Sequence, residues 1–312
     1  MSRGGRTEDS SGADAPHTVS GLVTAAWRRH YAVRLADGRT IKCLLRGRGL
    51  GIACGDRVSV APTADGEGAI HAILPRGTLL FRSDAHREKL LAANVTQVLG
   101  IVAPDPPYDD ELVQRWIVAA ESNGCAFALI ANKSDLPGFA KLGRRLEACR
   151  ALGYPVVAVS AKGDVSTVRA LVAGQRSVLI GQSGMGKSTL INALAPGAQA
   201  RVGDVSGALR AGRHTTSETT LYALDGEAWI VDSPGMKEFG LAHLSAAAIM
   251  QGFVDLDLRT FAGRCRFRDC RHGTEPGCAV QEAATRGEVK PWRVALLQTL
   301  LAESERRAQP WS

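Results

Sequence analysis

Apolar and polar positions change their rhythm twice along the chain, and each change marks a boundary between expected modules. Residues 19–73 hold short apolar or alternating runs separated by glycines, a pattern typical of β-strands joined by tight turns. Five short strands in so few residues predict a small closed barrel of the OB-like kind, and an SH3-like barrel fits the pattern alone as well. The expected strands are Val19–Ala25, Tyr31–Leu35, Thr40–Leu45, Arg57–Pro62 and Ala69–Ile73.

From about residue 95 the pattern becomes an alternation of apolar strands with amphipathic helices, after a linker over residues 74–94 that is expected to contain a helix at Asp84–Ala92. Such alternation predicts an α/β domain with a doubly wound, mostly parallel sheet. Strands are expected at Val98–Val102, Ala126–Ala131, Val156–Val159, Ser177–Ile180 and Trp229–Val231. Helices are expected at Asp110–Ser122, Leu142–Leu152, Val165–Ala173 and Lys187–Leu194.

The last segment, residues 241–312, has helical patterns on both sides of a compact cluster of cysteines. Helices are expected at Leu244–Gln251, Ala279–Arg286 and Trp292–Arg306, with Pro291 at the start of the last one. An apolar stripe on that helix, which we expect to pack on the neighbouring domain, consists of Leu296, Leu297, Leu300 and Leu301.

The composition shows that the chain is basic. The chain of 312 residues is 45% apolar, carries a formal net charge of +7 and has no apolar run long enough to span a membrane. Residues 1–18 lack the apolar core of a signal peptide and are expected to be a disordered tail. The basic surplus is densest in residues 18–73, where eight Lys and Arg stand against four Asp and Glu. A basic surplus favours a polyanionic partner, most simply nucleic acid, and a solvated surface is the alternative.

A phosphate-binding loop follows the expected strand Ser177–Ile180 and opens a helix. Its glycines let backbone N–H groups surround a β-phosphate, Lys187 neutralises β- and γ-phosphate oxygens, and the Ser188 hydroxyl ligates Mg²⁺. Asp232 ends a later strand, where a carboxylate for Mg²⁺ is needed, and Gly235 can turn its N–H toward the γ-phosphate. The loop consists of Gly181, Gln182, Ser183, Gly184, Met185, Gly186, Lys187, Ser188 and Thr189.

Two further motifs are typical of guanine recognition. In the first, which ends the strand Ala126–Ala131, the Asp135 carboxylate can accept from guanine N1–H and the exocyclic amine, which adenine cannot match, and the stem of Lys133 can pack on the base. In the second, the Ala161 N–H would meet guanine O6. All these loops follow strands of one parallel sheet, where ligands collect. The motifs are Asn132, Lys133, Ser134 and Asp135, and then Ser160, Ala161 and Lys162.

The order of these motifs is inverted, since the base-reading motifs precede the phosphate loop, which leads in ordinary P-loop GTPases. In this order, and in Gly55-Asp56-Arg57-Val58, Gly212-Arg213-His214-Thr215-Thr216 and the C-terminal cysteines, the chain resembles the circularly permuted GTPases of ribosome assembly, most closely the ribosome small subunit-dependent GTPase A family (RsgA). The resemblance covers roughly residues 19–305. It divides the chain into tail 1–18, RNA-binding barrel 19–73, GTPase domain 74–240 and zinc-binding helical domain 241–312.

The resemblance implies a cytoplasmic GTPase, without a membrane and expected to be a monomer, that acts late in maturation of the small (30S) ribosomal subunit. It implies slow hydrolysis of GTP to GDP, stimulation by that subunit and its 16S rRNA, and a link to release of another assembly factor. By resemblance, Thr216 meets Mg²⁺ and the γ-phosphate, with Thr215 as the neighbouring candidate, and His214 matches the family's proposed catalytic histidine. Met236 stands where many GTPases have a water-orienting Gln, so a histidine in the switch loop is a reasonable substitute.

Three of the seven cysteines cluster near the C-terminus with a histidine, and in a cytosolic chain such a cluster suggests metal rather than disulfides. Three thiolates and one imidazole complete a tetrahedral set for one structural Zn²⁺, and the family carries zinc there. The ligands are Cys265, Cys270, His272 and Cys278. We expect the arginines around them to contact rRNA phosphates, with a solvated face as the alternative. They are Arg264, Arg266, Arg268 and Arg271.

Two other classes compete with a GTPase. The first is a P-loop ATPase or kinase, against which Asp135 argues. The second is a zinc-dependent rRNA-binding scaffold with weak or vestigial hydrolysis, against which the intact Lys187, Ser188, Thr216 and Asp232 argue. The inverted order also leaves about 30 residues between Gly235 and the first zinc ligand, which suggests coupling between the γ-phosphate sensor and the zinc module.

Overall fold

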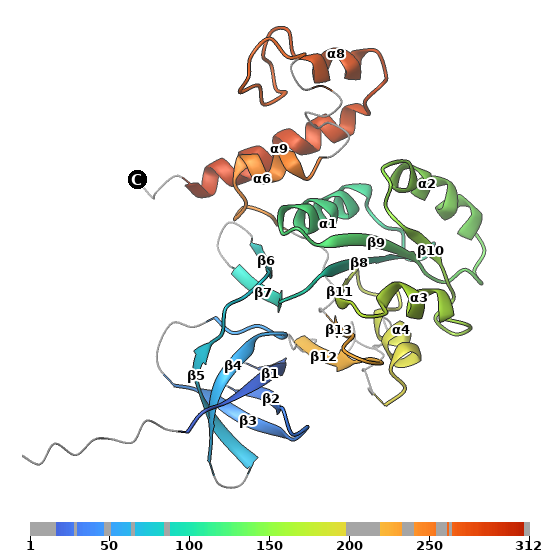
Figure 1. Cartoon of the computed structure of the whole chain (residues 1–312). Helices are drawn as coiled ribbons and strands as arrows, with labels where there is room; N and C mark the ends of the chain where they lie inside the picture. Colours follow the sequence, from blue (N-terminus) through green and yellow to red (C-terminus); the bar gives the residue numbers. More distant parts are fainter. Residues whose placement is uncertain are drawn as a thin grey trace, which may run out of the picture.

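The computed structural model describes residues 17–27, 30–46, 51–63, 66–83, 88–197, 219–232, 240–253, 261 and 264–308. In this part of the chain the elements form three modules, which lie one above the other in Figure 1. A barrel lies at the bottom, an α/β domain in the middle and a helical C-terminal module at the top.

The barrel consists of β1 (Val19–Ala26), β2 (Tyr31–Leu35), β3 (Thr40–Leu45), β4 (Arg57–Pro62) and β5 (Glu67–Ile73). The strands pair in the order β1-β2-β3-β5-β4, and β4 returns to pair with β1, which closes the barrel. Only the β3–β5 pair among these is parallel. Alternate positions such as Val23, Val33, Val58, Val60 and Ile70 fill the interior and are fully buried. The expected OB-like barrel is therefore confirmed.

The α/β domain contains β8 (Gln97–Val102), β9 (Ala126–Ala131), β10 (Val156–Ala158), β11 (Arg176–Ile180), β12 (Thr219–Ala223) and β13 (Trp229–Asp232). The order is β10-β9-β8-β11-β13-β12, with the first five strands parallel and β12 antiparallel. Every residue of β8 is buried, as a strand covered on both faces requires. The helices are α1 (Asp110–Ser122), α2 (Phe139–Ala151), α3 (Ser166–Val172) and α4 (Lys187–Leu194).

A hairpin of β6 (Leu79–Ser83) and β7 (Glu88–Ala93) connects the barrel to the α/β domain. The helix expected at Asp84–Ala92 is wrong for the described part of that range, 88–92. Leu91, Ala92 and Ala93 are good helix formers, yet pairing with β6 and burial against the main core decide the outcome.

The C-terminal module contains α6 (Ala246–Gln251), α8 (Ala279–Thr285) and α9 (Pro291–Ala308). Helix α6 packs on α1 of the α/β domain and on α9. The apolar stripe of α9 is buried, with Leu300 fully enclosed, in the same core cluster as apolar residues of α1. No helix in the described ranges combines the length and apolar character needed to cross a membrane.

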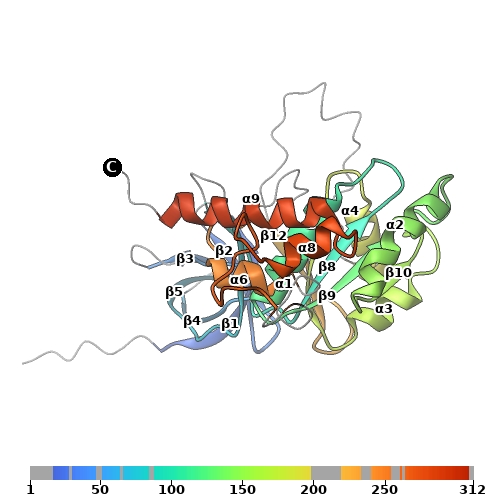
Figure 2. The ribbon, with the colours of Figure 1, turned by 90° about the horizontal axis from the view of Figure 1, so that it is seen from above.

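One sheet runs through the barrel and the α/β domain. The first residues of β1 pair with β4, and its last two residues, Ala25 and Ala26, pair with β12. The pairing joins the two modules into a single eleven-stranded sheet. Seen from above in Figure 2, α9 crosses over the α/β domain and reaches above the barrel strands. Strand β12, which the sequence pattern did not predict, is thus the element that joins the two modules.

Candidate nucleotide and metal sites

The motif loops meet at one edge of the parallel sheet. Asn132 directly follows β9, Gly181 directly follows β11, and Ser160 is two positions beyond the end of β10. The register pairs Leu179 of β11 with Asp232, the last residue of β13, so that carboxylate lies beside the root of the phosphate loop. The carboxyl ends of parallel strands are where ligands bind in such sheets.

The phosphate loop is closed on itself by Lys187. Its Nζ donates to the carbonyl oxygens of Gly181 at 2.7 Å and Gln182 at 2.9 Å. Gly186, with φ of +93°, turns the chain into α4, and a Cβ there would lie 2.3 Å from the Asn132 amide nitrogen. The backbone N–H groups at the start of this helix face the position that a phosphate takes in such loops.

Asn132 connects three of the motifs. Its side chain is 1% exposed, donates through Nδ2 to the Met185 carbonyl at 2.9 Å and accepts through Oδ1 from the Ala161 N–H at 3.0 Å. A buried amide with both ends satisfied fixes the geometry of the groups it joins. The sequence marked Asn132 as part of a motif and gave no sign of this bridging role.

The residues expected to read the base lie in two neighbouring loops. A hydrogen bond with the Ser160 hydroxyl lowers the pKa of Asp135, with smaller contributions from Lys162 and Lys133. The carboxylate is exposed and ionised, as a group that accepts from guanine must be. Lys133, in the left-handed conformation, donates through Nζ to the Asp105 carbonyl at 2.6 Å. Asp105 had no signal in the sequence.

Asp232 and Lys187 carry opposite charges that attract one another beside the phosphate loop. Burial raises the pKa of the Asp232 carboxyl to about 6, and Lys187 opposes this shift. Burial likewise lowers the pKa of the Lys187 ammonium to about 8, against the pull of Asp232. Asp232 Oδ1 is buried and has no hydrogen-bond partner among the described residues. An unsatisfied carboxylate oxygen beside the phosphate loop fits a site for hydrated Mg²⁺.

Three expected site residues, His214, Thr216 and Gly235, lie outside the described residues. Of the expected magnesium set, the described members are Ser188, the second residue of α4, and Asp232 at the end of β13.

The four expected zinc ligands come together in the C-terminal module. Their ligand atoms all lie within 4.8 Å of one another, and His272 Nδ1 is 3.7, 3.6 and 3.5 Å from the sulfurs of Cys265, Cys270 and Cys278. Tetrahedral zinc, with bonds of ~2.3 Å to sulfur and ~2.0 Å to nitrogen, would hold each sulfur about 3.5 Å from the nitrogen. The donor set and its spacing therefore fit zinc.

Polar contacts hold the loop that presents these ligands. Gln281 Nε2 donates to the carbonyls of His272 and Gly273, and the Glu275 carboxylate accepts from the N–H groups of Arg271 and Gly273. The four arginines among the ligands are all exposed, and Arg271 forms an ion pair with Glu305 of α9. Phe267, 42% exposed, lies within cation–π distance of Arg266.

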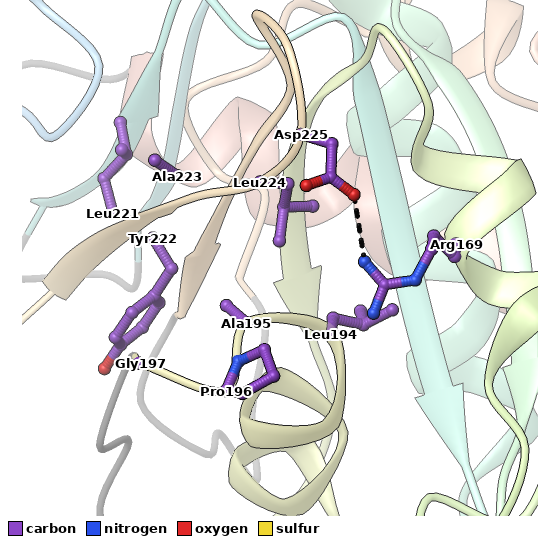
Figure 3. Close-up of a pocket in the computed structure, with 10 residues that line it drawn as sticks. All are labelled: Arg169, Leu194, Ala195, Pro196, Gly197, Leu221, Tyr222, Ala223, Leu224 and Asp225. Atoms are coloured by element: carbon purple, nitrogen blue, oxygen red, sulfur yellow. Dashed lines mark hydrogen bonds and ion pairs between the residues drawn. The ribbon is translucent and has the colours of Figure 1, made fainter.

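A separate pocket of about 450 Å³ lies between the end of α4 and the turn after β12 (Figure 3). Arg169 and Asp225 form an ion pair of 3.2 Å on one side, and Tyr222 lies on the other. None of the expected nucleotide or metal ligands lines this pocket, so it is distinct from both sites.

Comparison with known proteins agrees with this geometry. The family model described as RsgA GTPase matches residues 73–242, more than half of the chain. The curated Small ribosomal subunit biogenesis GTPase RsgA of Nitrosospira multiformis is 47% identical over 91% of this chain and 90% of its own. Its namesake from Nitrosomonas europaea is 43% identical over 97% of this chain and 98% of its own.

The chain belongs to the RsgA GTPase family. It is accordingly a GTP hydrolase, and the inverted motif order is that of a circularly permuted GTPase. The crystal structure of YjeQ from Thermotoga maritima superposes with a TM-score of 0.69 at 28% identity, covering 93% of this chain and 99% of that one. YloQ, titled a circularly permuted GTPase, has the same fold, with a TM-score of 0.65 at 24% identity over 97% of this chain and 100% of that one.

Proposed function

We propose that this GTPase binds GTP and GDP across the loops that Asn132 ties together. The bridge from Asn132 to Met185 and Ala161 carries the proposal, because it makes one site of three motifs that are up to 53 residues apart. Asp135 reads the guanine edge, and the phosphate loop surrounds the phosphates. Bound Mg²⁺ supplies positive charge at the β- and γ-phosphates, and Ser188, Thr216 and Asp232 hold it.

Hydrolysis requires a group that orients the attacking water. His214 takes that role in our proposal, Thr216 contacts the γ-phosphate, and the Gly235 N–H donates to it. The intact Lys187, which is buried, and Asp232, whose Oδ1 is buried, support hydrolysis rather than a vestigial site. Binding to the small ribosomal subunit would stimulate a slow basal rate by bringing His214 to the attacking water.

We also propose that the chain acts in late assembly of the small ribosomal subunit, as the names of its relatives say of them. The basic barrel and the exposed arginines beside the zinc ligands supply two surfaces for 16S rRNA phosphates. The proposal includes a monomer in the cytoplasm, one structural Zn²⁺, and a link to release of another assembly factor. The division at residues 18, 73 and 240 remains our proposal for the domains.

The experiment measures GTP turnover with and without purified small subunits, for the parent chain and His214→Ala. We expect stimulation of the parent chain and its loss in His214→Ala, with GDP affinity unchanged. Full stimulation of His214→Ala would remove that role. Undetectable turnover of the parent chain with small subunits present would contradict the proposed ribosomal function. A second measurement, GDP against ADP competition in Asp135→Ala, tests the guanine assignment, which fails if the preference for GDP persists.

A further inference from the structure

Residues 52–56, which lead into β4 of the barrel, are buried at the junction with the α/β domain. Cys54 Sγ donates to the Thr219 carbonyl of β12 at 3.0 Å, and its own carbonyl accepts from the Ala93 N–H at 2.8 Å. The next residue, Gly55, accepts at its carbonyl from Asn94 Nδ2 at 2.9 Å. Cys54 therefore forms hydrogen bonds to both β7 and β12, and Gly55 accepts one from the residue that follows β7.

Gly55 also makes a close approach that no other residue type permits. Its φ is +89°, and a Cβ would lie 2.2 Å from the Ala93 carbonyl oxygen and 3.1 Å from Cη2 of Trp229. Contacts this short cannot form, so any side chain at this position would separate the barrel from β7 and β13. Trp229 is the first residue of β13, the strand that ends at Asp232.

The backbone ladder connects the same two regions. Ala25 of the barrel pairs with Thr220 of β12, and Thr220 pairs with Asp232 of β13. Figure 1 shows β12 lying between β1 and β13. Asp232 is therefore two strands away from the barrel, and the first residue of its own strand packs on Gly55. A shift of the barrel must move the strand that carries this carboxylate, because packed strands transmit displacement rather than absorb it.

We propose that Gly55 is a positioning residue for Asp232, so that docking of the barrel sets the Mg²⁺ affinity of the nucleotide site. This inference rests on the proposed role of Asp232 toward Mg²⁺. It assigns the barrel a second role besides RNA contact, as the support that holds the carboxylate at the distance Mg²⁺ requires. By reciprocity, a ligand that shifts the barrel changes Mg²⁺ affinity, and bound Mg²⁺ changes affinity for that ligand.

Gly55→Ala tests the inference, with Gly38→Ala as its matched control. Gly38 belongs to the same barrel and has a φ of +85°, but a Cβ there meets nothing within 4 Å. Both variants therefore carry the same backbone strain, and only Gly55→Ala disturbs the contact with the α/β domain. The probe is N-methylanthraniloyl-GDP, whose fluorescence is followed as Mg²⁺ is titrated, with a parallel measurement in EDTA.

We expect Gly55→Ala to raise the Mg²⁺ concentration at half-saturation roughly three- to tenfold, a range typical of residues that modulate coupling. Gly38→Ala is expected to match the parent chain, and nucleotide affinity in EDTA is expected to be the same in all three. A merely structural loss would lower affinity in EDTA as well. A folded Gly55→Ala whose Mg²⁺ titration matches that of Gly38→Ala overturns the inference.

Two further variants keep the test decisive if Gly55→Ala does not fold. Cys54→Ala removes the donor to Thr219 and Cys54→Ser restores one. The first is therefore expected to raise the Mg²⁺ concentration at half-saturation, and the second to bring it back toward that of the parent chain. Equal titrations for the pair would count against the inference. Asp232→Asn separates the two proposals. If Asp232→Asn needs no more Mg²⁺ than the parent chain, both the magnesium role of Asp232 and this inference are refuted. If Asp232→Asn needs more Mg²⁺ but the Gly55 and Cys54 variants titrate like the parent chain, this inference alone is refuted.

Discussion

The barrel and the C-terminal module are attached to the GTPase domain in different ways and at different halves. The barrel continues the sheet through backbone pairing of β1 with β12, next to the strand that carries Asp232. The C-terminal module packs through side chains on α1, where Arg293 donates to Gln114 at 2.7 Å and Arg115 pairs with Glu303. Helix α1 belongs to the half that reads the base.

The difference shows how the permuted order is used. The barrel is joined to the phosphate-binding half, although the chain connects it to the base-reading half. The C-terminal module packs on the base-reading half, although the chain connects it to β13. Coupling from the γ-phosphate sensor to the zinc module, which the short connection suggested, stays a prediction, because Gly235 lies outside the described residues. Each accessory module contacts the half that is remote in sequence.

Loss of zinc is expected to have the largest effect and to stay within one module. Cys278→Ser removes a ligand from a set whose binding is worth on the order of 10 kcal/mol. Because the module is held by side chains and not by the sheet, we expect residues 264–290 to lose hydrogen-exchange protection while β9 keeps it. Zinc content and exchange rates check this, with Cys149→Ser, outside the cluster, as the control. Loss of protection in β9 as well would show that the two modules unfold together.

Destabilising the barrel is expected to affect the α/β domain as well, because the two modules share one sheet. Asp56 is fully buried and accepts from Arg76 Nε at 2.7 Å and from the Ala53 N–H at 2.8 Å. Asp56→Ala leaves a guanidinium without its partner at this junction, at a cost of about 3–5 kcal/mol. Urea unfolding and exchange at β12 measure the effect. Asp37→Ala, which breaks an exposed pair with Arg39 in the same barrel, should cause no measurable loss. Equal effects would contradict the junction's role.

The two halves of the site are expected to differ in pH dependence. Asp232, with its pKa raised to about 6, becomes protonated and loses its charge as pH falls through 6. Lys187, with its pKa lowered to about 8, loses its charge as pH rises through 8. Nucleotide binding with Mg²⁺ should be strongest between these values and fall by at most about tenfold per pH unit outside them. The preference for GDP over ADP should stay constant, because the pKa of Asp135 is lowered. A preference that follows the affinity profile would contradict this separation.

The smallest effect is expected at the side-chain clamp between α1 and α9. Arg115 and Glu303 are 15% and 24% exposed and share two hydrogen bonds of 2.8 and 2.9 Å. A double-mutant cycle with alanine at each position should give a coupling of about 1 kcal/mol, read from hydrogen exchange in α9. The exposed pair of Arg286 and Glu288 serves as the reference and should give no measurable coupling. A coupling no larger than that of the reference would show that apolar packing alone holds the module.

Sequence patterns predicted elements well where local signals and burial agree. Helix α1 has the expected bounds, since Asp109 caps it through the Glu111 N–H and its apolar face lies on the sheet. The hairpin strand β7 was mistaken for a helix because Leu90, Leu91 and Ala92 favour a helix locally, and only pairing with β6 overrides that preference. Strand β12 escaped the sequence pattern because it is short, and its pairing with β1 depends on residues nearly 200 positions away.

The residues of the candidate site also differ in how far local sequence reveals their roles. Motif residues such as Asp135 and Lys187 are recognisable because their chemistry depends on local spacing. The roles of Asn132, Asp105 and Gly55 are different, since each depends on a partner that the fold brings from elsewhere. A sequence pattern carries no record of such a partner, and only coordinates supply it.

The pairing of β1 with β12 has a consequence for the order in which the protein is made. Ala25 leaves the ribosome long before its partner Thr220 is synthesised, and domains generally fold as units from the N-terminus during translation. The barrel can close by pairing β1 with β4, while Ala25 and Ala26 stay without their β12 partners until that strand is synthesised. Arg115 is likewise synthesised long before its partner Glu303. The β1–β12 pairing and the Arg115–Glu303 pair therefore form late in synthesis, whereas the bonds from Cys54 and Gly55 to Ala93 and Asn94 can form much earlier.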